Sequence, residues 1–159
     1  MAKITRKHVI GATAGAAGAI GVALAIIPGF EGERHTVYRD IVGKATYCIG
    51  ETQNPQWGKV YTHEECTALL AGRLGEFQAG VRKCVHVAMP APVEGAMISL
   101  AYNIGTGAFC KSSIARKLNK GDFAGACDAL MLYDRAGGRE IYGLKRRRAA
   151  ERKVCVEGL

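Results

Sequence analysis

Residues 31–49 read EGERHTVYRDIVGKATYCI, and this stretch decides the fold that the sequence predicts. Residues 36–38 favour an extended strand, Gly43 favours a turn, and residues 46–49 favour a return strand. We therefore expect a small antiparallel hairpin over residues 35–52. Beyond it the apolar pattern changes to helical spacing, so the hairpin is the sheet part of the chain.

Helical signals fill the rest of the sequence. Thr62 and Glu65 form a capping box ahead of apolar residues whose spacings of three and four define one helix face over residues 66–81. A small sheet followed by several helices predicts an α+β domain with a sheet lobe and a mainly helical lobe. Further helices are expected over residues 93–104, after Ser112 or Ser113, after Asp122, and over residues 144–154.

Length and charge narrow the class of protein. A chain of 159 residues with 48% apolar content suffices for one domain with its own core, which excludes tandem domains and long repeat arrays. The net charge of +8 favours polyanionic partners, namely nucleic acid, anionic lipid or bacterial wall polymers. Charge alone does not choose among these three.

The N-terminus predicts export. Lys3, Arg6 and Lys7 precede an uncharged run of 22 residues, 9–30, which could cross a bilayer core of about 30 Å. Positive residues on its N-terminal side place the remainder of the chain outside the cytoplasm. We expect a basic cytoplasmic segment at residues 1–8, a weakly hydrophobic membrane segment at residues 9–29, and the main folded domain at residues 30–159.

The membrane segment is weak because twelve of the 22 residues in the run are Gly or Ala. Three interpretations compete. Ala23-Leu24-Ala25 has the small-x-small form of a signal-peptide cleavage site. The segment could also be a permanent anchor, or a marginal anchor that leaves the membrane.

All six cysteines lie beyond the apolar run, and an even number in an exported chain predicts up to three disulfides. The alternative is a set of buried thiols in a cytosolic protein. Our best single pairing is Cys48 with Cys66, because it would join a strand to the helix that follows. The other pairings stay open.

Glu31, Asp40 and Thr46 are the candidate catalytic residues. Glycoside hydrolysis needs one carboxylic acid to protonate the leaving oxygen and a second carboxylate to stabilise the transition state or activate water. Glu31 follows Phe30 at the edge of the apolar run, where partial desolvation favours the protonated acid. Asp40 enters a turn that keeps it ionised, and the Thr46 hydroxyl could hold a water. Taken alone, two solvated surface carboxylates would explain the same spacing.

The stretch from Glu31 to Thr46 resembles the catalytic signature of bacteriophage lysozymes of glycoside hydrolase family 24: Glu, eight residues, Asp or Cys, five residues, Thr. Residues 103–110, 119–122 and 143–148 resemble the helical lobe of the same family, so the resemblance covers residues 30 to 155. With the weak membrane segment, the chain is similar to signal-anchor-release endolysins of phages that infect Gram-negative bacteria. The expected fold is thus lysozyme-like.

This resemblance implies a muramidase that cuts the β-1,4 bond between N-acetylmuramic acid and N-acetylglucosamine in peptidoglycan. It implies that Glu31 is the general acid and that Asp40 with Thr46 positions the attacking water, which inverts the anomeric centre. Tyr102 and Asn103 match positions that line the saccharide cleft. No metal or organic cofactor is implied.

The basic cluster Arg146, Arg147 and Arg148 has two interpretations. One of the three could pair with Glu31, but the register is open. A solvated basic helix face is expected for at least two of them.

Two departures from the family pattern concern regulation and affinity. Glu51 follows Ile49-Gly50 where relatives often place His, so the charge at that edge of the cleft differs. The membrane segment lacks cysteine, and Asp40 occupies the position that is cysteine in relatives controlled by disulfide exchange. That redox switch is therefore unavailable here.

The expected partners are peptidoglycan and, before release, the inner membrane. We expect a monomer that is tethered and then released to the periplasm, with no nucleic-acid partner. Two alternatives come from other classes. A cationic protein could lyse membranes through its N-terminal segment without hydrolase activity, or the basic residues 145–148, 152 and 153 could bind nucleic acid, against which the export signal argues.

Overall fold

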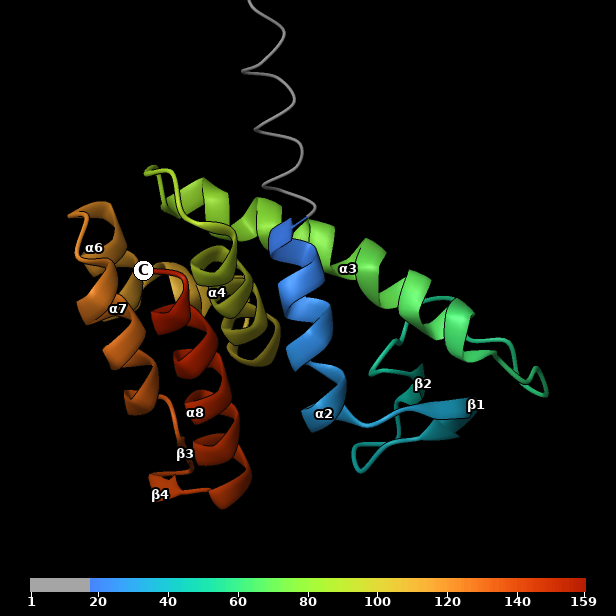
Figure 1. Cartoon of the computed structure of the whole chain (residues 1–159). Helices are drawn as coiled ribbons and strands as arrows, with labels where there is room; N and C mark the ends of the chain where they lie inside the picture. The colour runs from blue at the N-terminus through green and yellow to red at the C-terminus, as the bar shows by residue number, and fades with distance from the viewer. Residues whose placement is uncertain (1–17) are drawn as a thin grey trace, which may run out of the picture.

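A computed structural model describes residues 18–159, which form a small sheet lobe and a helical lobe (Figure 1). The long helix α3 (His63–Cys84) extends from the sheet lobe into the helical lobe. Residues 1–17, which include the expected basic segment and the first part of the expected membrane segment, lie outside the described residues. In chain order the other elements are α2 (Pro28–Glu31), β1 (Arg34–Arg39), β2 (Ala45–Cys48), α4 (Ala91–Ile104), α5 (Thr106–Cys110), α6 (Ser113–Asn119), α7 (Phe123–Ala129), η1 (Leu130–Leu132), β3 (Arg135–Ala136), β4 (Arg139–Glu140) and α8 (Tyr142–Glu157).

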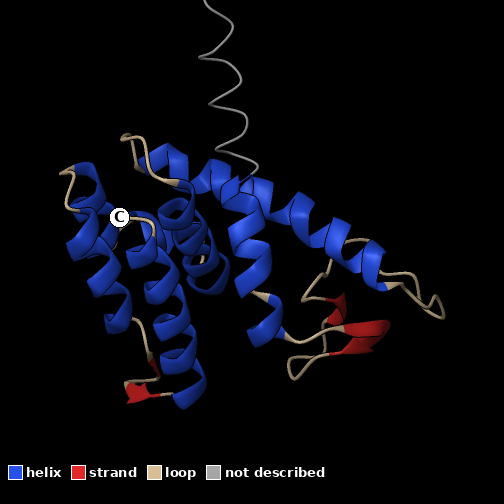
Figure 2. Ribbon diagram, viewed as in Figure 1, coloured by secondary structure: helices blue, strands red, loops and turns tan. Residues whose placement is uncertain are grey.

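The predicted hairpin is confirmed. β1 and β2 pair antiparallel, with Tyr38 opposite Thr46 and the register shifting toward the open end. Gly43 makes the turn with φ +80°, a conformation that favours glycine. A second hairpin, in which β3 and β4 have two residues each, was not predicted. Figure 2 shows both pairs of strands in red.

The helix-start predictions are confirmed by the caps. The Thr62 hydroxyl accepts from the Glu65 amide and the Glu65 carboxylate accepts from the Thr62 amide, which completes the capping box of α3. The side chains of Ser112 and Asp122 cap α6 and α7. The helix expected over residues 93–104 is α4, and Gly105 separates it from α5, which begins at the next residue.

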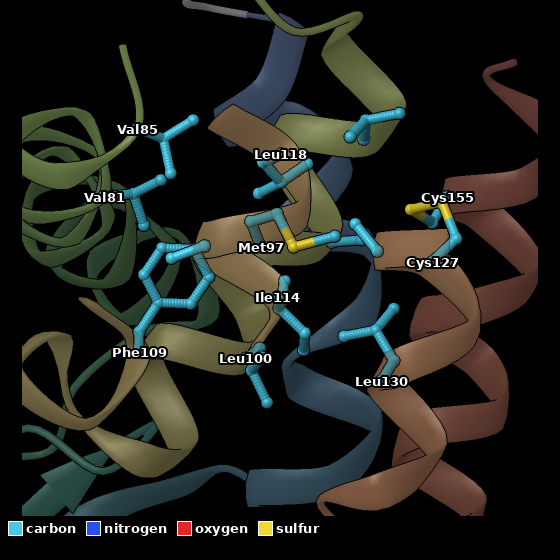
Figure 3. Close-up of a cluster of buried hydrophobic side chains, with 14 of the residues drawn as sticks. Val81, Val85, Met97, Leu100, Phe109, Ile114, Leu118, Cys127, Leu130 and Cys155 are labelled. Carbon is cyan, nitrogen blue, oxygen red and sulfur yellow. A yellow bond between two sulfur atoms is a disulfide. The ribbon is translucent and has the colours of Figure 1, made fainter. Parts of the chain in front are cut away.

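α4 is the centre of the helical lobe. Every residue from Val93 to Ala101 is buried, as expected for a helix that other elements surround on all sides. The core around it appears in Figure 3, where side chains of α4 meet those of the other helices. The labelled residues of this core are Val81, Val85, Met97, Leu100, Phe109, Ile114, Leu118, Cys127, Leu130 and Cys155.

A helix over residues 18–26 packs into the second core cluster, which belongs to the sheet lobe and its junction with α4. Ala19, Ala23 and Ile27 have no exposed surface. The packing against α4 is close, because a Cβ added at Gly95 would lie 2.5 Å from the Val22 side chain. Among residues 18–159, no helix is long and apolar enough to cross a membrane. The described part of the apolar run thus contributes to the folded core.

All six cysteines pair within the described chain. Cys48–Cys66 is present as predicted and joins β2 to α3. Cys84–Cys110 joins the end of α3 to α5, and Cys127–Cys155 joins α7 to α8 (Figure 3). The three bonds therefore connect neighbouring elements around both core clusters.

Candidate active site

Glu31 is the last residue of α2, a one-turn helix that Pro28 begins. Gly32, with φ +73°, then turns the chain into the sheet lobe. The Glu31 side chain is 28% exposed, and Nη1 of Arg147 donates to its Oε1 at 2.5 Å. The sequence predicted an apolar edge beside Phe30, and this edge is only part of what surrounds the Glu31 carboxylate. A guanidinium from α8 lies against the carboxylate as well.

Glu31 lines a cleft of about 300 Å³ between the two lobes. Tyr102 and Asn103, the predicted saccharide-binding residues, line the same cleft at the end of α4. The complete lining is Glu31, Gly50, Arg73, Phe77, Tyr102 and Asn103. Three of the five predicted site residues therefore meet in one hollow.

Asp40 and Thr46 lie together in the hairpin and are linked through the Lys44 peptide. The Asp40 Oδ1 atom accepts from the backbone amides of Val42 (3.0 Å) and Lys44 (2.8 Å). The Thr46 hydroxyl donates to the Lys44 carbonyl at 3.1 Å, and the Asp40 amide donates to the same carbonyl. Sequence analysis did not identify Lys44, because its peptide rather than its side chain makes the link. Within the described chain, neither Asp40 nor Thr46 lines the cleft at Glu31.

Tyr102 joins α4 to the sheet lobe at this cleft. Its hydroxyl donates to the Ile49 carbonyl at 2.8 Å, and a Cβ at Gly50 would lie 3.3 Å from that hydroxyl. Gly50 also has φ +74°, so both its space and its conformation favour glycine. Burial, with the nearby charges of Glu31 and Glu51, raises the pKa of Tyr102 to about 12. The phenol is therefore a neutral hydrogen-bond donor at neutral pH.

Glu51, the departure from the family pattern, is only 7% exposed. Its Oε1 accepts from the backbone amides of Thr52 (2.7 Å) and Gln53 (2.8 Å), and its Oε2 lies 3.8 Å from Nε of Arg73. These contacts make Glu51 a support for the loop behind Gly50. The sequence indicated an altered charge at this edge but not that Arg73 compensates it.

The expectation for the basic cluster of α8 is wrong. Arg147 and Arg148 are both buried, at 3% and 0% exposure, and only Arg146 is exposed. The register left open by the sequence is resolved, since Arg147 is the residue that contacts Glu31. α8 packs against α4, which removes two neighbouring arginines from solvent.

One group of described residues has metal-ligating side chains close together: Glu33, His35 and Cys66. Cys66 is bonded to Cys48, so its sulfur is not a free thiolate ligand. The Glu33 carboxylate instead contacts His63 Nδ1 at 2.9 Å. Two donors remain, the half-buried Glu33 and the exposed His35, and they are fewer than a structural metal site requires.

Comparison with known proteins gives the family. The phage lysozyme family model matches residues 28–151. The chain belongs to the phage lysozyme family. It is 40% identical over 163 residues to the SAR-endolysin of Bacteriophage PS119, covering 99% of this chain and 98% of the relative.

Solved structures agree with this family. The chain superimposes on a mutant of P22 lysozyme with a TM-score of 0.78 at 30% identity, covering 84% of this chain and 94% of that one. It superimposes on the active form of P1 phage endolysin Lyz with a TM-score of 0.76 at 26% identity, covering 86% and 84%. This phage lysozyme is a glycoside hydrolase that lyses cell walls, and peptidoglycan is its substrate.

Proposed function

We propose that this phage lysozyme cuts the β-1,4 bond between N-acetylmuramic acid and N-acetylglucosamine, with Glu31 as the general acid. Glu31 protonates the glycosidic oxygen as the bond breaks. Asp40, helped by Thr46, positions a water on the opposite face of the sugar, and its attack inverts the anomeric carbon. Tyr102 and Asn103 bind the saccharide beside Glu31.

The hydrogen bonds of the hairpin support the assignment of the water. Both hydrogen bonds that the Asp40 carboxylate receives from described residues reach Oδ1, so Oδ2 is left to accept from water. The Thr46 hydroxyl hydrogen is directed at the Lys44 carbonyl, which leaves the hydroxyl oxygen as an acceptor for the same water. Two acceptors can orient a water lone pair toward the sugar.

One observation carries the assignment of the acid: Glu31 is the carboxylate at the cleft that also contains Tyr102 and Asn103. In the purified full chain, Glu31→Gln should lower peptidoglycan hydrolysis by on the order of a thousandfold, because the amide has no proton to donate. Asp40→Asn should lower it by about a hundredfold. Release of reducing ends from purified walls measures both.

Glu64→Gln is the matched control, because Glu64 is an exposed carboxylate at the start of α3. It should hydrolyse walls at the rate of the unchanged protein. A Glu31→Gln protein that keeps its circular dichroism spectrum and near-normal activity would end the assignment.

The same proposal covers location. Residues 9–29 tether the exported protein to the inner membrane, and the released monomer acts on the wall in the periplasm without a nucleic-acid partner. The packing of residues 18–27 supports this order of events. Ala19, Ala23 and Ile27 are wholly inside the protein, so this arrangement and a bilayer-spanning segment exclude each other. In this proposal, the arrangement of residues 18–27 inside the protein is that of the released state.

Tethering also restrains catalysis in this proposal. Glu31 directly follows the apolar run, and the helix over residues 18–26 leads into α2, which presents Glu31 to the cleft. While the run spans the bilayer, Glu31 cannot lie against Arg147 of α8 in the cleft that Tyr102 lines. Misplacement of a catalytic group by about 1 Å can cost on the order of a hundredfold in rate, so the tethered form is nearly inactive.

A further inference from the structure

Three ionisable side chains of α8 lie in the interior behind Glu31. Arg147, Arg148 and Glu151 are 3%, 0% and 0% exposed. Their spacings of four and three residues place Glu151 against both arginines on one side of the helix. Removing charged groups from water costs several kcal/mol per ion unless each is well paired. The contacts of this cluster therefore decide what it does.

The Glu151 carboxylate joins the two arginines to α4. Its Oε1 accepts from Ser99 Oγ at 2.6 Å, from Arg147 Nε at 3.2 Å and from Arg148 Nη2 at 3.1 Å. Its Oε2 lies 2.8 Å from Arg148 Nε. One buried carboxylate thus contacts two guanidinium groups and a hydroxyl from a helix 52 residues away.

Arg147 is held at three of its nitrogen atoms. Nε donates to Glu151, Nη2 donates to the Ser99 carbonyl at 3.1 Å, and Nη1 donates to Glu31. A planar guanidinium with two nitrogens anchored has its third nitrogen fixed in direction. Glu151 and Ser99 therefore set where Nη1 meets the catalytic carboxyl.

The charges of the cluster also bear on Glu31. Two buried guanidinium groups face two carboxylates, Glu151 and Glu31. A general acid must begin the reaction protonated and uncharged. Glu151 is then the remaining anion beside Arg147 and Arg148. Without it, Glu31 would be the one carboxylate for both cations, and they would favour its ionised form.

The negative charge that Glu151 contributes is not supplied by Tyr102, Arg73 or Asp40. Tyr102 on α4 stays neutral, since its pKa is about 12. Arg73 on α3 lines the cleft, but its guanidinium contacts the carboxylates of Glu51 and Glu76. Asp40 lies in the hairpin, outside the cleft lining. Burial raises the pKa of Glu151 and lowers that of Arg148, which are the directions expected for charges removed from water.

We propose that Glu151 is a positioning residue for catalysis: it holds the Arg147 guanidinium against Glu31 and supplies the negative charge that allows Glu31 to carry its proton. This inference rests on the proposed function of Glu31 as the general acid. Glu151 itself has no exposed surface and does not touch substrate.

The test is Glu151→Gln in the full chain, with wall hydrolysis measured against pH and wall concentration. The amide keeps the size of the side chain and removes its charge. The maximal rate should fall about tenfold at an unchanged half-saturating wall concentration, and the alkaline limb of the profile should move to lower pH by about one unit. The acidic limb of the profile should stay in place. Glu157→Gln, an exposed carboxylate on the same helix, should match the unchanged protein.

A second variant, Arg148→Met with Glu151→Met, separates charge from position. It removes one cation and one anion together, a replacement that buried ion pairs often tolerate. The alkaline limb should return to within about 0.3 units of its original position because the charges balance again. The rate should stay low because Nε of Arg147 has lost its acceptor.

Circular dichroism and the absence of free thiols establish that each variant is folded. A folded Glu151→Gln protein with an unmoved alkaline limb would overturn the inference, and so would a double variant whose limb moves as far. If Glu151→Gln fails to fold, the double variant decides: a rate equal to that of the unchanged protein refutes the positioning. Activity of Glu31→Gln would instead remove the proposed acid, and this inference with it.

Discussion

At the scale of single residues, Tyr102 connects the lobes across the cleft. Its hydroxyl lies beside Gly50 and donates to the Ile49 carbonyl, so the phenol has to stay protonated for the contact to persist. Burial is the main reason that the pKa of Tyr102 rises to about 12, and the charges of Glu31 and Glu51 act in the same direction. The contact between the two lobes thus depends on the Tyr102 hydroxyl keeping its proton.

This shift predicts how stability depends on alkaline pH. The folded pKa of Tyr102 is about 12 and the unfolded value is 10.0, so the unfolded chain releases the proton first as pH rises. The free energy of unfolding that Tyr102 contributes is complete below pH 10 and is lost between pH 10 and 12, by about 2 to 3 kcal/mol. Urea unfolding at a series of pH values measures this loss.

Tyr102→Phe isolates the effect, because it should be less stable than the unchanged protein at pH 8 and should lose less stability toward pH 12. Tyr142→Phe is the control, since Tyr142 is 75% exposed and its removal should leave the alkaline slope unchanged. Parallel curves for the unchanged protein and Tyr102→Phe would contradict the assignment.

At the scale of elements, the contact between residues 18–26 and α4 depends on small side chains. A Cβ at Gly95 would lie 2.5 Å from Val22 and 2.8 Å from the Ala19 carbonyl, and a Cβ at Gly18 would lie 3.3 Å from Ala91. Glycine and alanine therefore allow the two helices to approach closely. The composition that weakens a membrane segment also suits it to this interior.

Gly95→Ala tests that packing. In most helix interiors the change from Gly to Ala adds about 0.5 to 1 kcal/mol of stability. Here the added methyl group collides with Val22, and we expect a net loss of about 1 to 3 kcal/mol together with weaker wall hydrolysis, because α2 and Glu31 follow the displaced helix. Urea denaturation and release of reducing ends give the two readouts.

Gly72→Ala in α3 is the matched control, since a Cβ there meets nothing within 4 Å. It should stabilise the protein slightly and leave hydrolysis unchanged. Equal stability changes of the same sign for Gly72→Ala and Gly95→Ala would show that the helix over residues 18–26 does not need the glycine.

At the scale of the whole molecule, membrane retention and activity should exclude each other, because both depend on where the same segment lies. Replacing Gly11, Gly15 and Gly21 with Leu should strengthen the membrane segment by about 2 kcal/mol. A Cβ at Gly21 meets nothing within 4 Å in the folded protein, so a side chain can begin there without a collision. The variant should be exported and retained, and it should not lyse cells even after an uncoupler collapses the membrane potential.

Cell fractionation and culture turbidity measure this outcome. Gly95→Ala provides the opposite case, because Gly95 lies outside the membrane segment and the variant should leave the membrane normally yet hydrolyse walls poorly. Full, prompt lysis by the Leu variant, with no released fragment, would refute topological control.

Much of the fold could be predicted from local sequence because the deciding interactions are local. The Thr62 and Glu65 capping box lies within one helical turn, and the hairpin follows from strand-forming residues on both sides of Gly43. The spacing of Glu31, Asp40 and Thr46 indicated the family for a related reason. Asp40 and Thr46 are separated by one tight turn, so their sequence spacing sets their geometry.

Only the tertiary structure decided which charges are buried and what they contact. α8 carries basic residues on more than one face, so nothing in residues 144–154 indicates that Arg147 and Arg148, rather than Arg146, face the interior. Ser99 lies 52 residues before Glu151, and Glu31 lies 116 residues before Arg147. Likewise, the composition of residues 18–27 suits both a membrane and a protein interior. Contacts over such separations depend on how whole helices pack, and neither periodicity nor spacing along the chain encodes that packing.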